Sequence, residues 1–182
     1  MTETALKIRI CGDPALRKKA KRIENITEVH RDILSHMARI MYEEQGIGLA
    51  APQLGIAEAM IVVDIGTGLY KLINPKVARK EGAQTMEEGC LSVPGVCIKV
   101  RRAKKVLVKG LDEFGKVVNI EAEGLLACVF QHEIDHLKGR LIIDYASFFE
   151  KIRIAKRLEE FKKKAEDEKL SESKTKSCKL QL

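Results

Sequence analysis

The sequence predicts an α+β domain in which mixed, mainly antiparallel strands surround a buried central helix, with a further helix at the C-terminus. Short β-branched runs bounded by turn residues indicate strands through the first two thirds of the chain. The segment 124–139 is bounded by glycines and is apolar on nearly every side in its first half, as a helix inside a domain is. The segment 147–164 has its apolar residues on one face, which is typical of a surface helix.

The elements before the central helix follow from alternation, helical spacing and turn residues. Apolar and cationic residues alternate over 6–10 and predict a short strand there. Thr27 is an N-cap candidate for a helix that should stop at Gly46. Asn74-Pro75 predicts a turn between two strands. The strands expected after the first helix are 59–65, 69–73, 77–80, 105–109 and 117–122, and the aperiodic segment 87–95, with its Gly, Pro and Ser, is expected to be a loop.

Length and composition fit one domain. With 182 residues, 45% of them apolar, the chain can bury a single core, and we expect it to span 1–165 and to end in the helix 147–164. The remainder, 166–182, is expected to be a charged, disordered tail. No apolar run approaches the roughly 20 residues of a membrane span, so no membrane contact is predicted. Five cysteines, an odd number, favour reduced thiols and hence a cytoplasmic location.

The positive charge is concentrated at the C-terminal end. The net charge is +7, and the segment 151–182, with eleven Lys or Arg and six Asp or Glu, contributes +5 of it. A basic helix can approach RNA or another polyanion, but the same composition also fits a solvated helix with a frayed end. The chain has no Trp and only eight Phe plus Tyr, so it lacks an aromatic platform for single-stranded nucleic acid, and no DNA partner is predicted.

The predicted central helix contains the sequence His132-Glu133-Ile134-Asp135-His136. Two histidines four residues apart lie on one helical face, where both imidazoles can reach one metal ion. Glu133 lies beside them and can take a proton from a metal-bound water. Two His and two acids on an otherwise apolar helix would be costly to bury without such a ligand. The motif therefore predicts a metal site.

A catalytic tetrahedral site needs a third protein ligand and one open position. The metzincin pattern continues with Gly at Gly139 but then requires a His where this chain has Ile142, so it is excluded. Among the cysteines we prefer Cys90, because it lies in the 87–95 loop between residues that fix the backbone. The weaker candidates are the remaining cysteines and three acidic residues of the C-terminal helix: Cys11, Cys97, Cys128, Cys178, Glu150, Glu159 and Glu160.

Three separated segments resemble the peptide deformylase family, and the resemblance covers about residues 5–150. They read GIGLAAPQ over 46–53, EGCLS over 88–92 and QHEIDH over 131–136, in the family's order. The resemblance implies that Cys90, His132 and His136 hold one divalent metal, Fe(II) first, with Zn or Ni as alternatives. It also implies hydrolysis of the formamide on a nascent N-formyl-methionyl peptide, with release of formate.

The same resemblance assigns the other site residues. Glu133 would be the general base and then the general acid. The developing oxyanion would be stabilised by the side-chain amide of Gln53 and by the backbone N–H of Leu91. The substrate would be bound by four residues that admit the peptide backbone or line a pocket for its Met side chain: Gly46, Ile47, Gly48 and Val129. One departure is Cys97, which stands where many members have an Arg that contacts the peptide.

Two other functions remain open from the sequence. A general metallopeptidase would share the two His and Glu133 but would cleave internal peptide bonds. A basic ribosome- or RNA-binding protein would hold a structural metal, and substitution of Glu133 would leave it unaffected. The family resemblance itself implies that the basic C-terminal helix can contact the ribosome.

Overall fold

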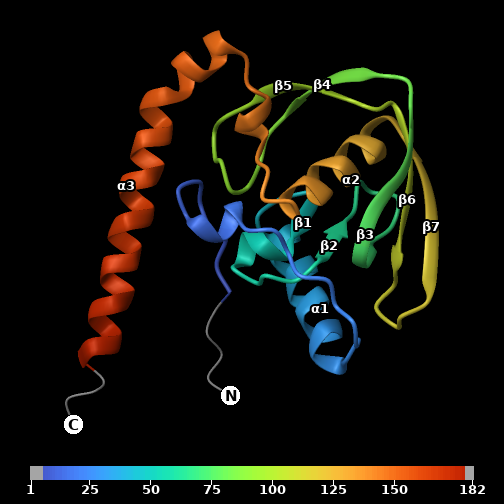
Figure 1. Cartoon of the computed structure of the whole chain (residues 1–182), viewed down its shortest axis with the longest axis horizontal. Helices are drawn as coiled ribbons and strands as arrows, with labels where there is room; N and C mark the ends of the chain where they lie inside the picture. The colour runs from blue at the N-terminus through green and yellow to red at the C-terminus, as the bar shows by residue number, and fades with distance from the viewer. Residues whose placement is uncertain (1–5, 179–182) are drawn as a thin grey trace.

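The computed structural model describes the backbone of residues 6–178 and the side chains of residues 6–166. The α+β prediction is confirmed (Figure 1). A five-stranded antiparallel sheet has the order β1-β2-β3-β6-β7, and a separate antiparallel pair is formed by β4 and β5. The strands are β1 Gly48–Ala50, β2 Met60–Val63, β3 Tyr70–Glu81, β4 Gln84–Glu88, β5 Ile98–Arg102, β6 Lys105–Leu111 and β7 Val117–Glu123.

Two helices cover opposite faces of the main sheet. The helices are α1 Glu28–Glu43, α2 Gly124–His136 and α3 Phe148–Cys178, and single 3-10 turns occur at Pro14–Arg17, Ala51–Leu54 and Ile142–Tyr145. On one face, α1 buries Leu34, Met37 and Met41 against β1, β2 and β3. On the other face, α2 packs Phe130 and Ile134 against β2, β3 and β6. The sheet therefore fixes both the position and the rotation of α2, the expected central helix.

α2 is buried because almost no part of its surface is polar until its last two turns. Phe130 is fully buried and makes an edge-to-face contact with the Tyr70 ring at 5.4 Å between centroids. Gly124 begins the helix directly after β7, with φ of +61°, which suits a glycine at that sharp turn. Gly139, with φ of +72°, follows the end at His136 and lies against the backbone of Arg17. Both predicted boundaries of the central helix are thus glycines in the left-handed region.

Two expectations in the first half of the chain were wrong in detail. Residues 6–10 form no strand: they have no ladder partner in the described part of the chain, and Arg9 N–H bonds to the carbonyl of Gln53, in the 3-10 turn Ala51–Leu54, at 2.7 Å. α1 ends at Glu43, and Gln45, not Gly46, takes the left-handed conformation, with φ of +56°. Gly46 N–H then bonds to the Met41 carbonyl at 2.8 Å and closes the helix.

The expected turn at Asn74-Pro75 is a bulge inside one continuous strand, β3. The register against β6 shifts between Ile73 and Lys76, and Asn74 has φ of +52°. The Asn74 side chain bonds to both backbone groups of Ile23, at 2.9 and 2.7 Å. These two bonds replace the ladder contacts that the bulge removes, so the strand bends without ending.

The segments around the expected loop and tail also differ from the prediction. The loop runs over 89–97 and not over 87–95, because Glu87 and Glu88 belong to β4, which pairs with β5. α3 continues well past Lys164, to Cys178, because the sequence after 164 contains no Gly or Pro to end it. The expected disordered tail is therefore helical over 166–178, and its last part, 179–182, lies outside the described residues.

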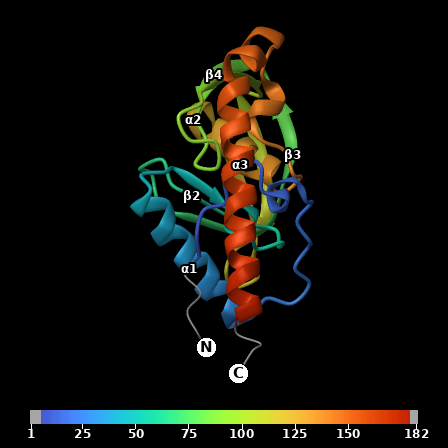
Figure 2. The same ribbon diagram turned by 90° about the vertical axis from the view of Figure 1, so that its left-hand side faces the viewer.

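α3 crosses one side of the molecule and contacts the body along part of its length (Figures 1 and 2). Its residues Ile154 and Phe161 join a core cluster with Val93 and Val96 of the β4–β5 loop and with Leu16 of the first 3-10 turn. The helix thereby covers the outer side of that loop. Within the described residues, no helix combines the length and apolar character that crossing a membrane requires.

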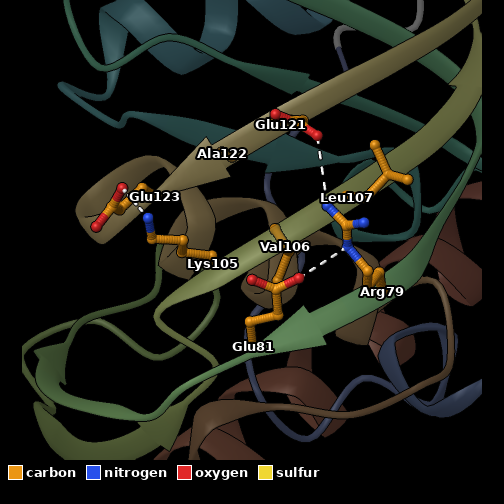
Figure 3. Close-up of a pocket in the computed structure, with 8 residues that line it drawn as sticks. All are labelled: Arg79, Glu81, Lys105, Val106, Leu107, Glu121, Ala122 and Glu123. Atoms are coloured by element: carbon orange, nitrogen blue, oxygen red, sulfur yellow. Dashed lines mark hydrogen bonds and ion pairs between the residues drawn. The ribbon is translucent and has the colours of Figure 1, made fainter.

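A small hollow of about 180 Å³ lies on the strands β3, β6 and β7 (Figure 3). Its charged side chains pair with one another, both along β3 and across the strands. Arg79 bonds to Glu81 at 3.0 Å and to Glu121 at 3.4 Å, and Lys105 bonds to Glu123 at 3.1 Å. These pairs account for the charges that line the hollow, so its described residues offer no unpaired charge to a ligand.

Candidate metal centre and active-site cleft

α2 and the β4–β5 loop bring one sulfur and two imidazoles together. His132 and His136 lie one turn apart on α2, and their Nε2 atoms are 3.2 Å apart. Cys90, two residues after β4 ends, places its Sγ 3.3 Å from His136 Nε2. The three ligand atoms all lie within 4.8 Å of one another. Of the described residues, only this group has the ligand types and spacing to hold a metal ion.

The chemistry of the donors fits a divalent transition metal. A thiolate and two neutral imidazoles suit Fe, Ni or Zn and leave a fourth position open. Glu88 Oε2 lies 2.9 Å from His132 Nδ1, which turns Nε2 of that ring toward the other ligands. Burial, together with the neighbouring His132, lowers the pKa of His136, so its imidazole stays neutral, the form that binds metal.

Glu88 is in turn held by a buried ion-pair network behind the ligands. Arg102 donates to both Glu88 oxygens, at 2.5 and 2.9 Å, and to Asp135 at 2.8 Å. Tyr145 O–H donates to Asp135 at 2.6 Å, and the Cys128 thiol donates to Glu88 at 3.1 Å. Burial alone would raise the pKa of Glu88, but hydrogen bonds from His132 and Arg102 hold it at about 2. Glu88 therefore stays ionised as it orients His132.

Glu133 is also a buried carboxylate, but its pKa shifts in the opposite direction from that of Glu88. Its side chain is on the face of α2 toward β1, it is only 3% exposed, and its Oε2 has no hydrogen-bond partner among the described residues. Burial raises its pKa to about 7. Gly48 of β1 makes room for it, because a Cβ on Gly48 would overlap the Glu133 carboxylate. A carboxylate in this setting can both accept and return a proton near neutral pH.

Two hydrogen-bond donors lie beside Cys90. Gln53 is buried, with its Oε1 fixed by the Ala50 N–H at 2.8 Å. Its Nε2 donates to Ser92 Oγ at 3.2 Å and points to Cys90 Sγ at 3.7 Å. The Leu91 N–H, next along the chain, has no acceptor among the described residues. The two donors come from different elements, the 3-10 turn Ala51–Leu54 and the β4–β5 loop, and both residues line the cleft beside Cys90.

A cleft of about 600 Å³ opens over this group. Its walls are the segment after α1 and the β4–β5 loop, and its floor is α2. Nine of the ten residues singled out in the sequence line it, namely Gly46, Ile47, Gly48, Gln53, Cys90, Leu91, Val129, His132 and Glu133. The tenth, His136, lies beneath them, almost fully buried. The fold thus brings all ten residues to one place.

The other ligand candidates lie elsewhere. Cys128 bonds to Glu88, Cys11 is buried under the first 3-10 turn, and Cys97 is exposed outside the cleft. Glu150 bonds to Ser147 at the start of α3. Glu159 and Glu160 are not among the residues grouped with the two histidines, and the Cys178 side chain lies outside the described residues.

Sequence reasoning missed the network of Glu88, Arg102, Asp135 and Tyr145. One signal could have found part of it. In β5, buried and exposed residues alternate, and Arg102 occupies the same face as Ile98 and Val100. A cation at an inward-facing strand position requires a buried acid as partner.

Comparison with known proteins gives a consistent result. Residues 5–151 match the family model described as polypeptide deformylase. The peptide deformylase of Halothermothrix orenii is 55% identical over 141 residues, which are 76% of this chain and 92% of that protein. The crystal structure of peptide deformylase from Thermus thermophilus is 36% identical, with a TM-score of 0.83, covering 87% of this chain and 98% of that one.

The structure of a Synechococcus elongatus peptide deformylase, in complex with actinonin, is 39% identical, with a TM-score of 0.80 over 86% of this chain and 90% of that one. The family match spans the sheet, α1, α2 and every residue of the cleft described above. Because sequence, fold and family model agree over most of its length, the chain belongs to the polypeptide deformylase family.

Proposed function

We propose that this chain removes the formyl group from the N-terminal formyl-methionine of nascent peptides, using Cys90, His132 and His136 to hold one divalent metal. Peptide deformylases are hydrolases that act on such peptides, and their reaction is metal-dependent. The observation that carries the proposal is the position of Glu133. Its carboxylate is buried and partly unpartnered, among the described residues, beside a three-ligand sulfur and nitrogen set at the floor of an open cleft.

Each residue has a role that its surroundings support. When bound, a divalent ion supplies Lewis-acid polarisation and lowers the pKa of a water. Glu133 takes a proton from the attacking water and returns it to the amine nitrogen as the C–N bond breaks, so that formate and a free amino terminus result. The Gln53 amide and the Leu91 N–H donate to the carbonyl oxygen as negative charge develops on it.

The cleft fits a peptide that begins with methionine. Val129 of α2 lines its floor, and Ile47, 44% exposed, lines its rim, so that both offer apolar contact to an unbranched side chain. Gly46 and Gly48 flank Ile47 without side chains of their own, which lets a substrate backbone lie along this edge. We assign these four residues to substrate binding.

We propose Fe(II) as the native ion, with Zn or Ni as functional replacements. A thiolate-ligated ferrous site is sensitive to oxygen. Protein prepared in air should lose activity with time, and preparation without oxygen or loading with nickel should preserve it. Equal stability of the iron, zinc and nickel forms in air would contradict iron.

We also propose that the basic helix α3 contacts ribosomal RNA, and that the protein works in the cytoplasm. The segment 151–182 carries a net charge of +5, and lysines pair with phosphates in a salt-dependent way. The double variant Lys163→Glu with Lys164→Glu should lose salt-sensitive co-sedimentation with ribosomes, while Lys116→Glu on the β6–β7 hairpin should retain it. Unchanged co-sedimentation of the double variant would contradict the contact.

The variant Glu133→Gln tests the activity directly. It keeps the shape of the side chain but cannot accept the proton, so formate release from a formyl-Met dipeptide should stop while the metal content stays the same. Glu160→Gln on α3 is the matched control and should leave the rate unchanged. Cleavage of an internal peptide bond would instead support a general metallopeptidase, and full activity of Glu133→Gln would contradict the proposed mechanism.

A further inference from the structure

The outer wall of the cleft is formed by Pro94 and Gly95, in the loop that joins β4 to β5. This loop consists of two consecutive turns that share Val93. Val93 N–H bonds to the Cys90 carbonyl at 2.9 Å, and Val96 N–H bonds to the Val93 carbonyl at 3.3 Å. The wall residues therefore lie at the apex of the second turn, past the metal ligand.

The first turn is fixed from the body of the protein. Ser92 is fully buried, its carbonyl accepts from Cys11 N–H at 2.7 Å, and its Oγ accepts from Gln53. The Val93 side chain is also fully buried, within the cluster that includes Phe161 of α3. These contacts hold Cys90 in place independently of the apex.

Among the described side chains, Arg157 of α3 is the one that hydrogen-bonds to the apex. Its Nε donates to the Pro94 carbonyl at 3.2 Å. Its guanidinium lies over Gly95, because a Cβ built there would come within 3.0 Å of Arg157 Cζ. The Phe161 ring supports it from the other side, 5.8 Å from Cζ to the ring centroid. Gly95 itself has φ of +68°, so the backbone conformation under the guanidinium favours glycine.

α3 contributes this contact from outside the segment that the family model covers, since that match ends at residue 151. The contact that holds this part of the cleft wall thus comes from a part of the chain that the family match does not include. The apex lies farther along the loop than Cys90 and Leu91, where the formyl group would react. Since Pro94 and Gly95 line the same cleft beyond those two residues, we expect them to contact the peptide residues that follow the formyl-methionine.

We infer that Arg157 is a positioning residue for specificity: it holds Pro94 and Gly95 as the subsite wall for the peptide residues that follow formyl-methionine. This inference rests on the proposed function. It separates two properties of the loop. Contacts of the first turn set the metal ligand and the chemistry, whereas the contact of Arg157 with the second turn sets affinity for the longer part of the substrate.

The test compares Arg157→Ala with the wild type on two substrates, a formyl-Met dipeptide and a pentapeptide that begins with formyl-Met. Loss of one charge-assisted hydrogen bond at an exposed site should raise KM for the pentapeptide about five-fold, equivalent to about 1 kcal/mol. KM for the dipeptide, kcat for both substrates and the bound metal should stay the same. Arg157→Lys should recover part of the loss, because Lys can still donate to the Pro94 carbonyl.

Two further variants complete the design. Lys156→Ala, the adjacent exposed residue on α3, should change neither substrate. In Gly95→Ala the new methyl group would overlap the Arg157 guanidinium and displace it. This variant should raise KM for the pentapeptide and leave KM for the dipeptide unchanged. Equal effects of Arg157→Ala on both substrates, or a fall in metal content, would show a merely structural role and overturn the inference. Wild-type protein without formate release would overturn the proposed function and this inference together.

Discussion

Arg102 holds the two buried carboxylates behind the candidate metal ligands, so its loss should destabilise the fold. In the variant Arg102→Met, a side chain of similar length loses the charge that pairs with Glu88 and Asp135. Arg102 is 5% exposed, and its partners are 6% and 12% exposed, so water cannot replace the three hydrogen bonds. Removing one member of a buried ion pair costs about 3–5 kcal/mol, because the remaining charges stay buried without a partner.

A loss of that size is a large fraction of the roughly 5–15 kcal/mol that stabilises an ordinary domain. Equilibrium unfolding in urea at pH 7 measures it, with the metal removed from both proteins so that metal affinity does not enter. The double variant with Glu88→Gln removes one of the two stranded carboxylates and should recover about 1–3 kcal/mol of the loss. The reasoning would be refuted if Arg102→Met had a free energy of unfolding within about 1 kcal/mol of the wild type. It would also be refuted if the double variant lost the sum of the two single-variant losses.

Three other predictions follow from single contacts. Gly48→Ala should displace the Glu133 carboxylate and lower formate release about a hundredfold, with unchanged metal content, whereas normal turnover would show that the contact does not matter. Phe130→Ala should lower the free energy of unfolding by about 3–5 kcal/mol, and a loss below about 1 kcal/mol would contradict its place in the core. The Tyr42 O–H donates to Asp64 at 2.7 Å, and this hydrogen bond raises the pKa of the phenol because it is lost when the phenol ionises at high pH. Asp64→Asn should therefore lower the pKa of Tyr42 toward 10 in an ultraviolet titration. An unchanged titration curve would refute this prediction.

Local pattern was enough to predict the parts of the site that depend on a single element. His132 and His136 face one way because they are four apart on a helix, and Glu133 follows from the same geometry. The helix itself was evident from its apolar composition and its terminal glycines. The family resemblance then supplied Val129 on the same helix and the residues from other segments, such as Gln53 and Leu91, and it supported the choice of Cys90; spacing alone does not connect those other segments to α2.

What the pattern missed depends on where separate segments meet. Alternation over 6–10 is real, but a strand also needs an open sheet edge, and the loops there offer only single acceptors such as the Gln53 carbonyl. Asn74-Pro75 has the composition of a turn, and only its contact with Ile23 makes it a bulge. α3 was expected to end near Lys164 because its apolar face ends there, although its composition permits a longer helix.

The two buried glutamates of the site show why those long-range contacts matter for chemistry. Glu88 and Glu133 are the same residue type, are almost equally buried and both line the cleft beside His132. Burial alone would raise the pKa of both carboxylates. The hydrogen bonds from His132 and Arg102 reverse this for Glu88, to about 2, whereas Glu133 has no such bonds among the described residues and its pKa rises to about 7. Glu88 is thereby kept as an anion that orients the His132 ring, whereas Glu133 can gain or lose a proton near neutral pH, as its proposed role requires. His132 and Arg102, which reach only one of the two carboxylates with hydrogen bonds, account for the difference.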